Sequence, residues 1–181
     1  MTSKTKLYDA KRLRLMQDIG EKERSVVKRN PVYIILDNVL DTYNIGAIFR
    51  LADAGAVERV IICGDSEIPP NHRIKKASIN TTEWVKWEYA ENAVLAIKNL
   101  RSEVKDLQVI AVEQSSTSQP YDKTEYKFPL ALVVGHETDG VSGEVLKACD
   151  RTVEIPMWGV NKSMNVMVSL AIVLFESLKK V

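Results

Sequence analysis

Cysteine is scarce in this chain of 181 residues, which contains only Cys63 and Cys149. Two cysteines are too few for a disulfide framework or a cysteine-rich zinc site. His72 and His136 also stand alone, so the sequence offers no cluster of the usual metal ligands. We therefore expect a cytoplasmic protein from a reducing compartment, with no metal centre.

Long hydrophobic runs are also missing. The most apolar stretch, Val166 to Phe175, is about half as long as the roughly 20 residues that a membrane span requires. Residues 1–30 are polar and charged, unlike the apolar core of a secretory signal. The sequence thus predicts neither a membrane span nor secretion.

The chain has no large excess of either charge, because it contains 25 Lys and Arg residues and 24 Asp and Glu residues. This balance excludes a uniformly basic coat that would bind nucleic acid nonspecifically. The charge is nevertheless uneven, since residues 1–30 hold nine of the basic but only four of the acidic side chains. We expect a basic N-terminal helical arm over residues 1–30 and one domain over residues 31–181.

The signatures of several common enzyme classes are absent as well. No G-x-G-x-x-G follows the first predicted strand, and the segment Gly159 to Ser163 lacks the glycine placement of a P-loop. No G-x-S-x-G elbow accompanies the two histidines. These absences disfavour a Rossmann dehydrogenase, a P-loop NTPase and a serine hydrolase.

Short β-branched apolar runs do alternate with helical patterns from Pro31 onward. The pattern predicts strands at 32–36, 59–64, 85–89, 108–112, 130–134 and 152–155, and helices at 44–56, 90–104, 142–148 and 163–179. A loop with a short helix is expected at 65–82. This alternation is typical of an α/β fold with a mostly parallel sheet flanked by helices. Ligands of such sheets bind beyond the carboxyl ends of the strands.

Three segments at predicted strand-to-helix junctions carry candidate functional residues: 44–50, 135–140 and 155–165. Each has an ordinary structural explanation when taken alone, and His136 is best explained as a structural loop residue. The other structural assignments are a helix cap for Asn44, a solvated helix position for Arg50, a loop carboxylate for Glu137, and caps of the last helix for Ser163 and Asn165.

Together and in this order, the segments resemble the motifs of the SpoU (TrmH-like) branch of the SPOUT superfamily of S-adenosylmethionine-dependent RNA methyltransferases. The resemblance covers about residues 31–180, and no motif residue departs from the pattern. The first motif, N-x-x-x-x-x-R, is matched by Asn44 and Arg50, and the second, G-x-E, by Gly135 and Glu137. The third motif is I-P-M followed by S-x-N, and it is matched by Ile155-Pro156-Met157 and Ser163-Met164-Asn165.

The resemblance implies a trefoil-knotted SPOUT domain, in which the C-terminal helix passes through a loop, and it implies a homodimer. The last predicted helix independently favours a dimer, because it is apolar on nearly every side. One of its faces can cover the sheet while another contacts a partner subunit.

The activity implied by the resemblance is methyl transfer from S-adenosylmethionine to a ribose 2′-hydroxyl of tRNA or rRNA. The implied cofactor-binding residues, which act largely through backbone groups, are Val112, Gly135, Ile155 and Met164. The implied catalytic residues are Asn44, Arg50, Glu137, Ser163 and Asn165.

Arg50 is the family's candidate for activating the acceptor hydroxyl. A guanidinium with a reference pKa of about 12.5–13.8 is a poor proton acceptor. Its forked hydrogen bonds suit an RNA phosphate or ribose. We therefore interpret Arg50 as an RNA contact, and a role as the base stays open. The resemblance assigns Asn44, Ser163 and Asn165 to positioning Arg50, the hydroxyl and the cofactor.

A local basic surface must admit the RNA, because the total charge is nearly neutral. Arg73, Lys75 and Lys76 are candidates in the 65–82 segment, and Lys11 and Arg12 are candidates in the arm. A solvated helix face is the alternative explanation for the arm.

Two other functions are compatible with the same motifs. The first is a SPOUT-fold RNA-binding protein without catalytic activity, which would have no need of the full set of motif residues. The second is a methyltransferase that acts on a base atom, whereas the arginine of the first motif favours ribose. The sequence does not distinguish tRNA from rRNA as the substrate.

Overall fold

A computed structural model describes residues 11–12 and 27–181. The strands are β1 (Asn30–Asp37), β2 (Val57–Cys63), β3 (Trp87–Ala90), β4 (Gln108–Val112), β5 (Gln119–Pro120), β6 (Leu130–Gly135) and β7 (Arg151–Glu154). The helices are α3 (Thr42–Ala54), α4 (His72–Ser78), α5 (Ala93–Glu103), α6 (Gly143–Ala148) and α7 (Val166–Leu178), with 3-10 turns at Thr81–Glu83 and Tyr121–Lys123.

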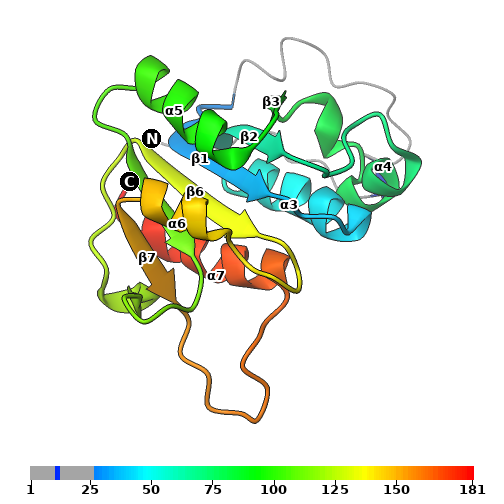
Figure 1. The fold of residues 1–181 in the computed structure, drawn as a ribbon. Helices are drawn as coiled ribbons and strands as arrows, with labels where there is room; N and C mark the ends of the chain where they lie inside the picture. Colours follow the sequence, from blue (N-terminus) through cyan, green and yellow to red (C-terminus); the bar gives the residue numbers. More distant parts are fainter. Residues whose placement is uncertain (1–10, 13–26) are drawn as a thin grey trace.

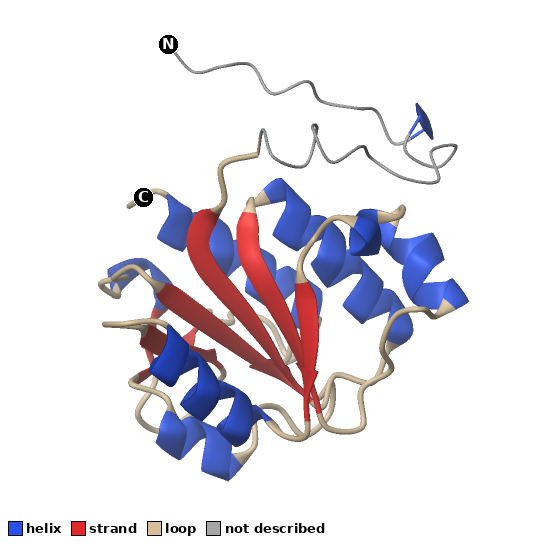
Figure 2. Cartoon of the chain, turned by 90° about the horizontal axis from the view of Figure 1, so that it is seen from above, coloured by secondary structure: helices blue, strands red, loops and turns tan. Residues whose placement is uncertain are grey.

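The strands form one sheet in the order β3-β2-β1-β6-β4-β7-β5, and every neighbouring pair is parallel. Helices lie on both sides of this sheet (Figures 1 and 2). The expected α/β class is therefore confirmed. The threading of α7 through a loop stays a prediction.

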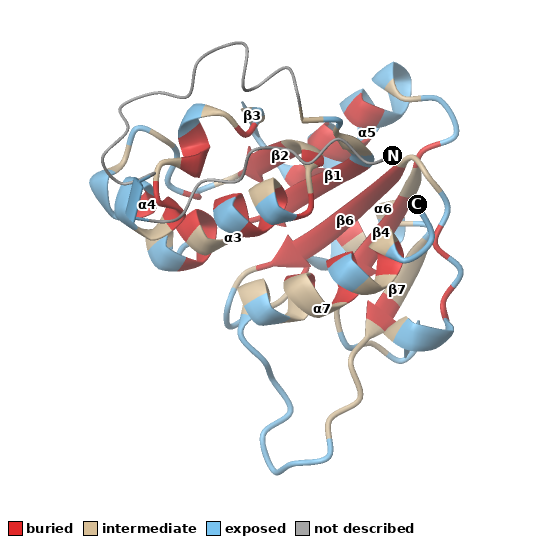
Figure 3. Cartoon of the chain, turned by 180° about the vertical axis from the view of Figure 1, so that it is seen from behind, coloured by how far each residue is buried: buried red, intermediate tan, exposed pale blue. Residues whose placement is uncertain are grey.

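Alternate side chains of β1 divide the core into two layers, as the period of a strand requires. Ile34 and Leu36 pack with α3 and α7, whereas Ile35 packs with α5 and α6. Both faces of β1 are therefore buried, which explains its continuous apolar run. Figure 3 shows the buried central strands between helices with exposed outer faces.

Several helix boundaries differ from the sequence prediction, including the start of α5, which is Ala93 instead of residue 90. Helix α3 begins at Thr42, and the side chain of Asp41 caps it by accepting a hydrogen bond from the Tyr43 amide at 2.7 Å. The expectation that Asn44 caps this helix is therefore wrong. Helix α7 begins at Val166 instead of residue 163, because the preceding residues form a loop and Asn165 is the cap.

Helix α4 packs closely on α3 through Gly46. A Cβ at this position would lie 2.5 Å from the Cβ of Ala77 and 2.7 Å from the carbonyl oxygen of Ile74. The absent side chain thus allows the two helix backbones to approach. The expected short helix within 65–82 is confirmed as α4.

The N-terminal arm is described only in part, and its other residues lie outside the described ranges. Lys11 and Arg12 are helical and exposed. Arg29 is half-buried and donates hydrogen bonds to the carbonyl oxygens of Val57 at 3.4 Å and Trp84 at 3.1 Å. The end of the predicted arm is thus attached to the sheet domain.

Both cysteines are free thiols, Cys63 fully buried and Cys149 partly buried. Burial raises the pKa of each thiol to about 12, so both remain protonated at neutral pH. Within residues 11–12 and 27–181, every helix is too short or too polar to cross a bilayer.

Candidate cofactor and catalytic site

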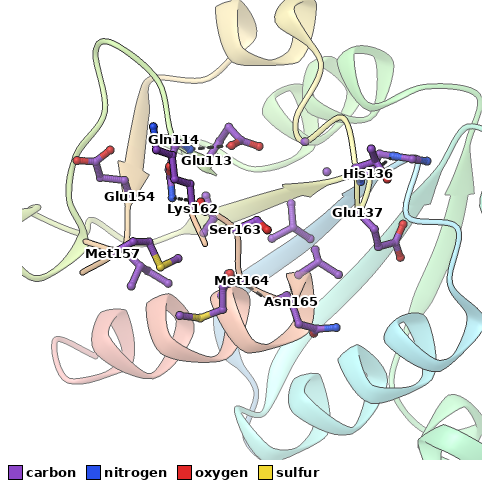
Figure 4. Close-up of a pocket in the computed structure, with 18 of the residues that line it drawn as sticks. Glu113, Gln114, His136, Glu137, Glu154, Met157, Lys162, Ser163, Met164 and Asn165 are labelled. Carbon is purple, nitrogen blue, oxygen red and sulfur yellow. Dashed lines mark hydrogen bonds between the residues drawn. The ribbon is translucent and has the colours of Figure 1, made fainter. Parts of the chain in front are cut away.

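A cavity of about 470 Å³ opens at the carboxyl ends of β4, β6 and β7 (Figure 4). Its walls come from the residues that follow these three strands and from the loop before α7. This is the edge at which ligands of parallel sheets bind. The volume lies within the range of about 300–1,000 Å³ that is usual for small-molecule sites.

The four residues assigned to the cofactor all line this cavity: Val112, Gly135, Ile155 and Met164. Val112 and Gly135 end β4 and β6, while Ile155 and Met164 lie at the two ends of the 155–165 loop. The fold therefore brings together positions that are up to 52 residues apart in the sequence.

Gly135 has a structural reason to be a glycine. A Cβ at this position would collide with the backbone of Gly140. The turn between them is closed by hydrogen bonds from the His136 amide to the Gly140 carbonyl at 3.1 Å and from the Gly140 amide to the His136 carbonyl at 2.9 Å. Gly135 is therefore needed because the backbone of Gly140 packs directly against it, beside the cavity.

His136 stabilises the same turn. Its Nδ1 accepts hydrogen bonds from the backbone amides of Thr138 at 3.1 Å and Asp139 at 3.2 Å. Its Nδ1 also lies 3.4 Å from Asp139 Oδ2, so all of these contacts are made within the turn. The structural assignment of His136 agrees with this geometry.

Side-chain hydrogen bonds join the three sequence motifs. Asn44 is buried at the start of α3, where its Nδ2 donates to Glu137 Oε1 at 2.9 Å. Asn44 Oδ1 accepts from Asn165 Nδ2 at 2.9 Å. One amide side chain thus links the loop after β6 to the residue that caps α7.

Asn165 serves both as a helix cap and as a partner of Asn44. Its Oδ1 accepts hydrogen bonds from the backbone amides of Met167 at 3.0 Å and Val168 at 3.3 Å. Its Nδ2 remains available for Asn44. The structural and functional explanations of Asn165 are therefore compatible.

Glu137 holds the N-terminal end of α3. Its Oε1 also accepts from the Asp41 amide at 3.0 Å, and its Oε2 accepts from the Leu40 amide at 3.2 Å. Partial burial acts to raise the pKa of this carboxyl, but the hydrogen bonds from Asn44 and from the two backbone amides outweigh burial and lower the pKa. Glu137 is therefore ionised at neutral pH.

Ser163 lines the cavity but does not join this network. Its hydroxyl and its amide both donate to Asn161 Oδ1 at 3.0 Å. Arg50 lies farther along α3, where it is exposed and does not line the cavity. Its guanidinium forms no hydrogen bond or ion pair with any residue that the structure describes. The fold thus groups Asn44, Glu137 and Asn165, places Ser163 beside them, and leaves Arg50 apart.

Three carboxylates that sequence analysis did not select also line the cavity: Glu113, Asp139 and Glu154. Glu113 accepts from the backbone amide of Val141 at 2.9 Å, and Glu154 accepts from the Ser118 hydroxyl at 2.6 Å. The signal that could have identified Glu113 is its position directly after the predicted strand 108–112. These negative charges favour a cationic ligand.

Gln114 and Lys162 complete one wall of the cavity. Gln114 Nε2 donates to the Lys162 carbonyl oxygen at 2.8 Å, which ties the loop before α7 to the end of β4. In Figure 4, Gln114 and Lys162 lie on one side of the cavity and Glu137 on the other. Met157 lies on the same side as Gln114 and Lys162, Met164 lies beside Asn165, and both side chains add apolar surface to the cavity wall.

The other basic candidates lie away from the cavity. Arg73, Lys75 and Lys76 are exposed on α4, and Lys75 pairs with Glu83 at 3.8 Å. Residues of α4 do not line the cavity. Among the described residues, no group of three or more His, Cys, Asp or Glu side chains is arranged to hold a metal ion.

The donor set of the cavity suits S-adenosylmethionine. Its methionine side chains and Ile155 offer apolar contacts for an adenine ring and a methionyl chain, while the carboxylates complement the charge of a sulfonium.

Comparison with known proteins gives a consistent family assignment. A family model described as the SpoU rRNA Methylase family matches residues 31–175. The chain is 31% identical over 150 residues to the 23S rRNA (guanosine-2′-O-)-methyltransferase of Ralstonia nicotianae, which covers 83% of this chain and 59% of that relative. It is 30% identical over 173 residues to the tRNA (guanosine(18)-2′-O)-methyltransferase of Aquifex aeolicus, covering 92% and 75% of the two chains.

Solved structures give the same result. The TrmH/SpoU tRNA modifying enzyme of A. aeolicus superposes with a TM-score of 0.75 at 28% identity, covering 94% of this chain and 81% of that chain. An AdoMet-bound rRNA methyltransferase from Sinorhizobium meliloti shares the fold with a TM-score of 0.75 at 24% identity, covering 93% and 60%. The chain therefore spans about three fifths of the length of the rRNA methyltransferase relatives.

Proposed function

Because the chain belongs to the SpoU rRNA methylase family, we propose that it transfers a methyl group from S-adenosylmethionine to a ribose 2′-hydroxyl of tRNA or rRNA. The observation that carries this proposal is the hydrogen-bonded set Asn44, Glu137 and Asn165 at the rim of a cavity at the sheet's carboxyl edge. The names of the relatives, which are 2′-O-methyltransferases of rRNA and tRNA, support it.

Backbone groups at Val112, Gly135, Ile155 and Met164 would hold the cofactor. When bound, S-adenosylmethionine supplies a methyl group activated by its sulfonium. The side chains of Ile155 and Met164, which line the cavity, would contact the apolar parts of the cofactor, and Glu113 adds a negative charge to the wall. We also infer the trefoil knot from family membership.

Glu137 acts as a positioning residue in this mechanism. Both of its oxygens already accept hydrogen bonds, and its lowered pKa makes it a weak base. It therefore holds Asn44 and the start of α3 beside Asn165. Ser163, which lines the cavity, is suited to orient the acceptor hydroxyl.

Arg50 is exposed and outside the cavity lining, so its guanidinium is available to RNA. We assign it to forked hydrogen bonds with a phosphate or ribose of the substrate. Arg73, Lys75 and Lys76 on α4, with Lys11 and Arg12 of the arm, are proposed as phosphate contacts.

We further propose a homodimer. Val168, Ile172 and Phe175 lie at helical spacing along α7 and form the apolar stripe of this helix. Phe175 is 48% exposed, and an exposed apolar stripe of this kind favours association. The free thiols favour a reducing compartment, and we propose the cytoplasm.

The purified protein, incubated with methyl-labelled S-adenosylmethionine and with bulk tRNA or rRNA that lacks 2′-O-methylation, tests the proposal. We expect label in one of the two RNA classes. Tight RNA binding without any label would identify an inactive RNA-binding protein instead. Calorimetry without heat at millimolar S-adenosylmethionine would contradict the methyltransferase assignment.

A further inference from the structure

Trp158 is the most exposed aromatic side chain of the described residues. It is 92% exposed and lies on the 155–165 loop between β7 and α7. This loop projects away from the sheet and its helices in two opposite views (Figures 1 and 3). The other two tryptophans, Trp84 and Trp87, are half-buried against the core.

The loop that carries Trp158 also forms part of the cofactor cavity. Met157 on one side of Trp158, and Ser163 and Met164 on the other, line the cavity. The hydrogen bond from Gln114 Nε2 to the Lys162 carbonyl at 2.8 Å ties the loop to the end of β4. Trp158 is therefore next to the reaction site in the chain, but its ring faces solvent.

If the ribose hydroxyl of a nucleotide enters a cavity, the base of that nucleotide can no longer stack on its neighbours in the RNA. RNA-binding proteins compensate for this loss by stacking aromatic rings on unpaired bases. A tryptophan ring offers the largest surface for this contact.

We propose that Trp158 stacks on a base of the RNA segment that enters the cavity, and that it is thereby a substrate-recognition residue. The inference rests on the proposed function and extends it to the unpaired state of the substrate. Lys162 is the sole charged residue of the 155–165 loop, and its exposed ammonium suits the phosphate beside a stacked base.

Charge and position favour RNA over a second copy of this chain as the partner of Trp158. Beyond the exposed Trp158 and Val160, the loop is polar and cationic at Asn161, Lys162 and Ser163, which are also exposed. The apolar stripe of α7 is better suited than this loop to contact a second copy of the chain. The two views show the loop extending away from that helix.

Steady-state kinetics with the RNA class that accepts label tests the proposal. Trp158→Ala should raise the KM for RNA by roughly 5- to 150-fold, the range expected for one lost base stack. The value of kcat at saturating RNA and the Kd for S-adenosylmethionine should stay within about twofold of wild type. Trp158→Phe should restore most of the affinity, and Val160→Ala is the matched control on the same exposed loop.

Tryptophan fluorescence tests the contact without methyl transfer. A single-stranded oligouridine should quench the emission of the wild-type protein more than that of Trp158→Phe. If the protein transferred no methyl group but Trp158 was still quenched, the proposed RNA contact would be supported. The proposed methyl transfer would then be wrong.

Three results would overturn the assignment of Trp158. The first is an RNA affinity unchanged in Trp158→Ala, and the second is equal quenching in wild type and Trp158→Phe. The third is a loss of the dimer or of cofactor affinity in Trp158→Ala with RNA contacts intact. That result would place Trp158 in a subunit interface or in the cavity wall.

Discussion

At the scale of single residues, Asn44 connects the parts of the candidate site. It is only 8% exposed, yet both ends of its amide are hydrogen-bonded, to Glu137 and to Asn165. These partners are 93 and 121 residues away in the sequence. The resemblance to the family motifs therefore identified all three residues, but their positions in the sequence did not indicate that they touch.

The ionised state of Glu137 should contribute to stability in a pH-dependent way. A carboxyl whose pKa is lowered by folding stabilises the protein above its ordinary pKa of roughly 4.3, and this contribution is lost as the pH falls through the lowered value. Glu137→Gln should therefore reduce the free energy of unfolding by about 1 kcal/mol at pH 7, a small effect because solvent screens this partly buried group.

Denaturant unfolding of Glu137→Gln at pH 7 and below pH 4 checks this expectation, with the exposed Glu125→Gln as the control. The difference from wild type should shrink in acid. A difference that grows as the pH falls would show that the carboxylate is not stabilised by its hydrogen bonds.

Arg50 should affect the rate of methyl transfer but not the affinity for the cofactor, because it lies outside the cavity lining. Arg50→Ala should reduce methylation at least 100-fold, with an unchanged Kd for S-adenosylmethionine by calorimetry. Arg50→Lys should fail as well, since an ammonium cannot reproduce the forked geometry. Wild-type turnover in Arg50→Ala would return Arg50 to the role of a solvated helix residue.

At the scale of secondary-structure elements, the long apolar segments were predictable and the boundaries were not. The runs within β1, β2, β4 and β6 are buried on both faces, so their composition is sufficient to identify them. The start of α3 was misplaced because Asp41 and Asn44 are both good capping residues. The two-residue β5 is too short to show any periodicity.

The packing of α3 on α4 should depend on the missing side chain of Gly46. A methyl group there would meet Ala77 and the backbone of Ile74, so Gly46→Ala should destabilise the protein by about 1–3 kcal/mol. Gly143→Ala in α6 is the matched control, because its Cβ would meet nothing within 4 Å. Thermal unfolding measures both, and equal stability of the two variants would contradict the close packing.

At the scale of the whole molecule, the apolar stripe on α7 should mediate self-association. Light scattering should give about twice the monomer mass of 20.4 kDa. Phe175→Glu and Val168→Lys should shift the protein toward the monomer, because each puts a charge into an apolar contact. Val94→Glu, on the exposed side of α5, is the control. A wild-type mass near 20 kDa at micromolar concentration would contradict the homodimer.

The central claim is that the acceptor is a ribose hydroxyl, and alkaline hydrolysis of the labelled RNA tests it most directly. A methyl group on the 2′-oxygen prevents that oxygen from attacking the neighbouring phosphate, so the labelled linkage survives alkali. The account predicts that the label from S-adenosylmethionine is recovered in alkali-resistant dinucleotides. Recovery of the label in mononucleotides would place the methyl group on a base and contradict the account.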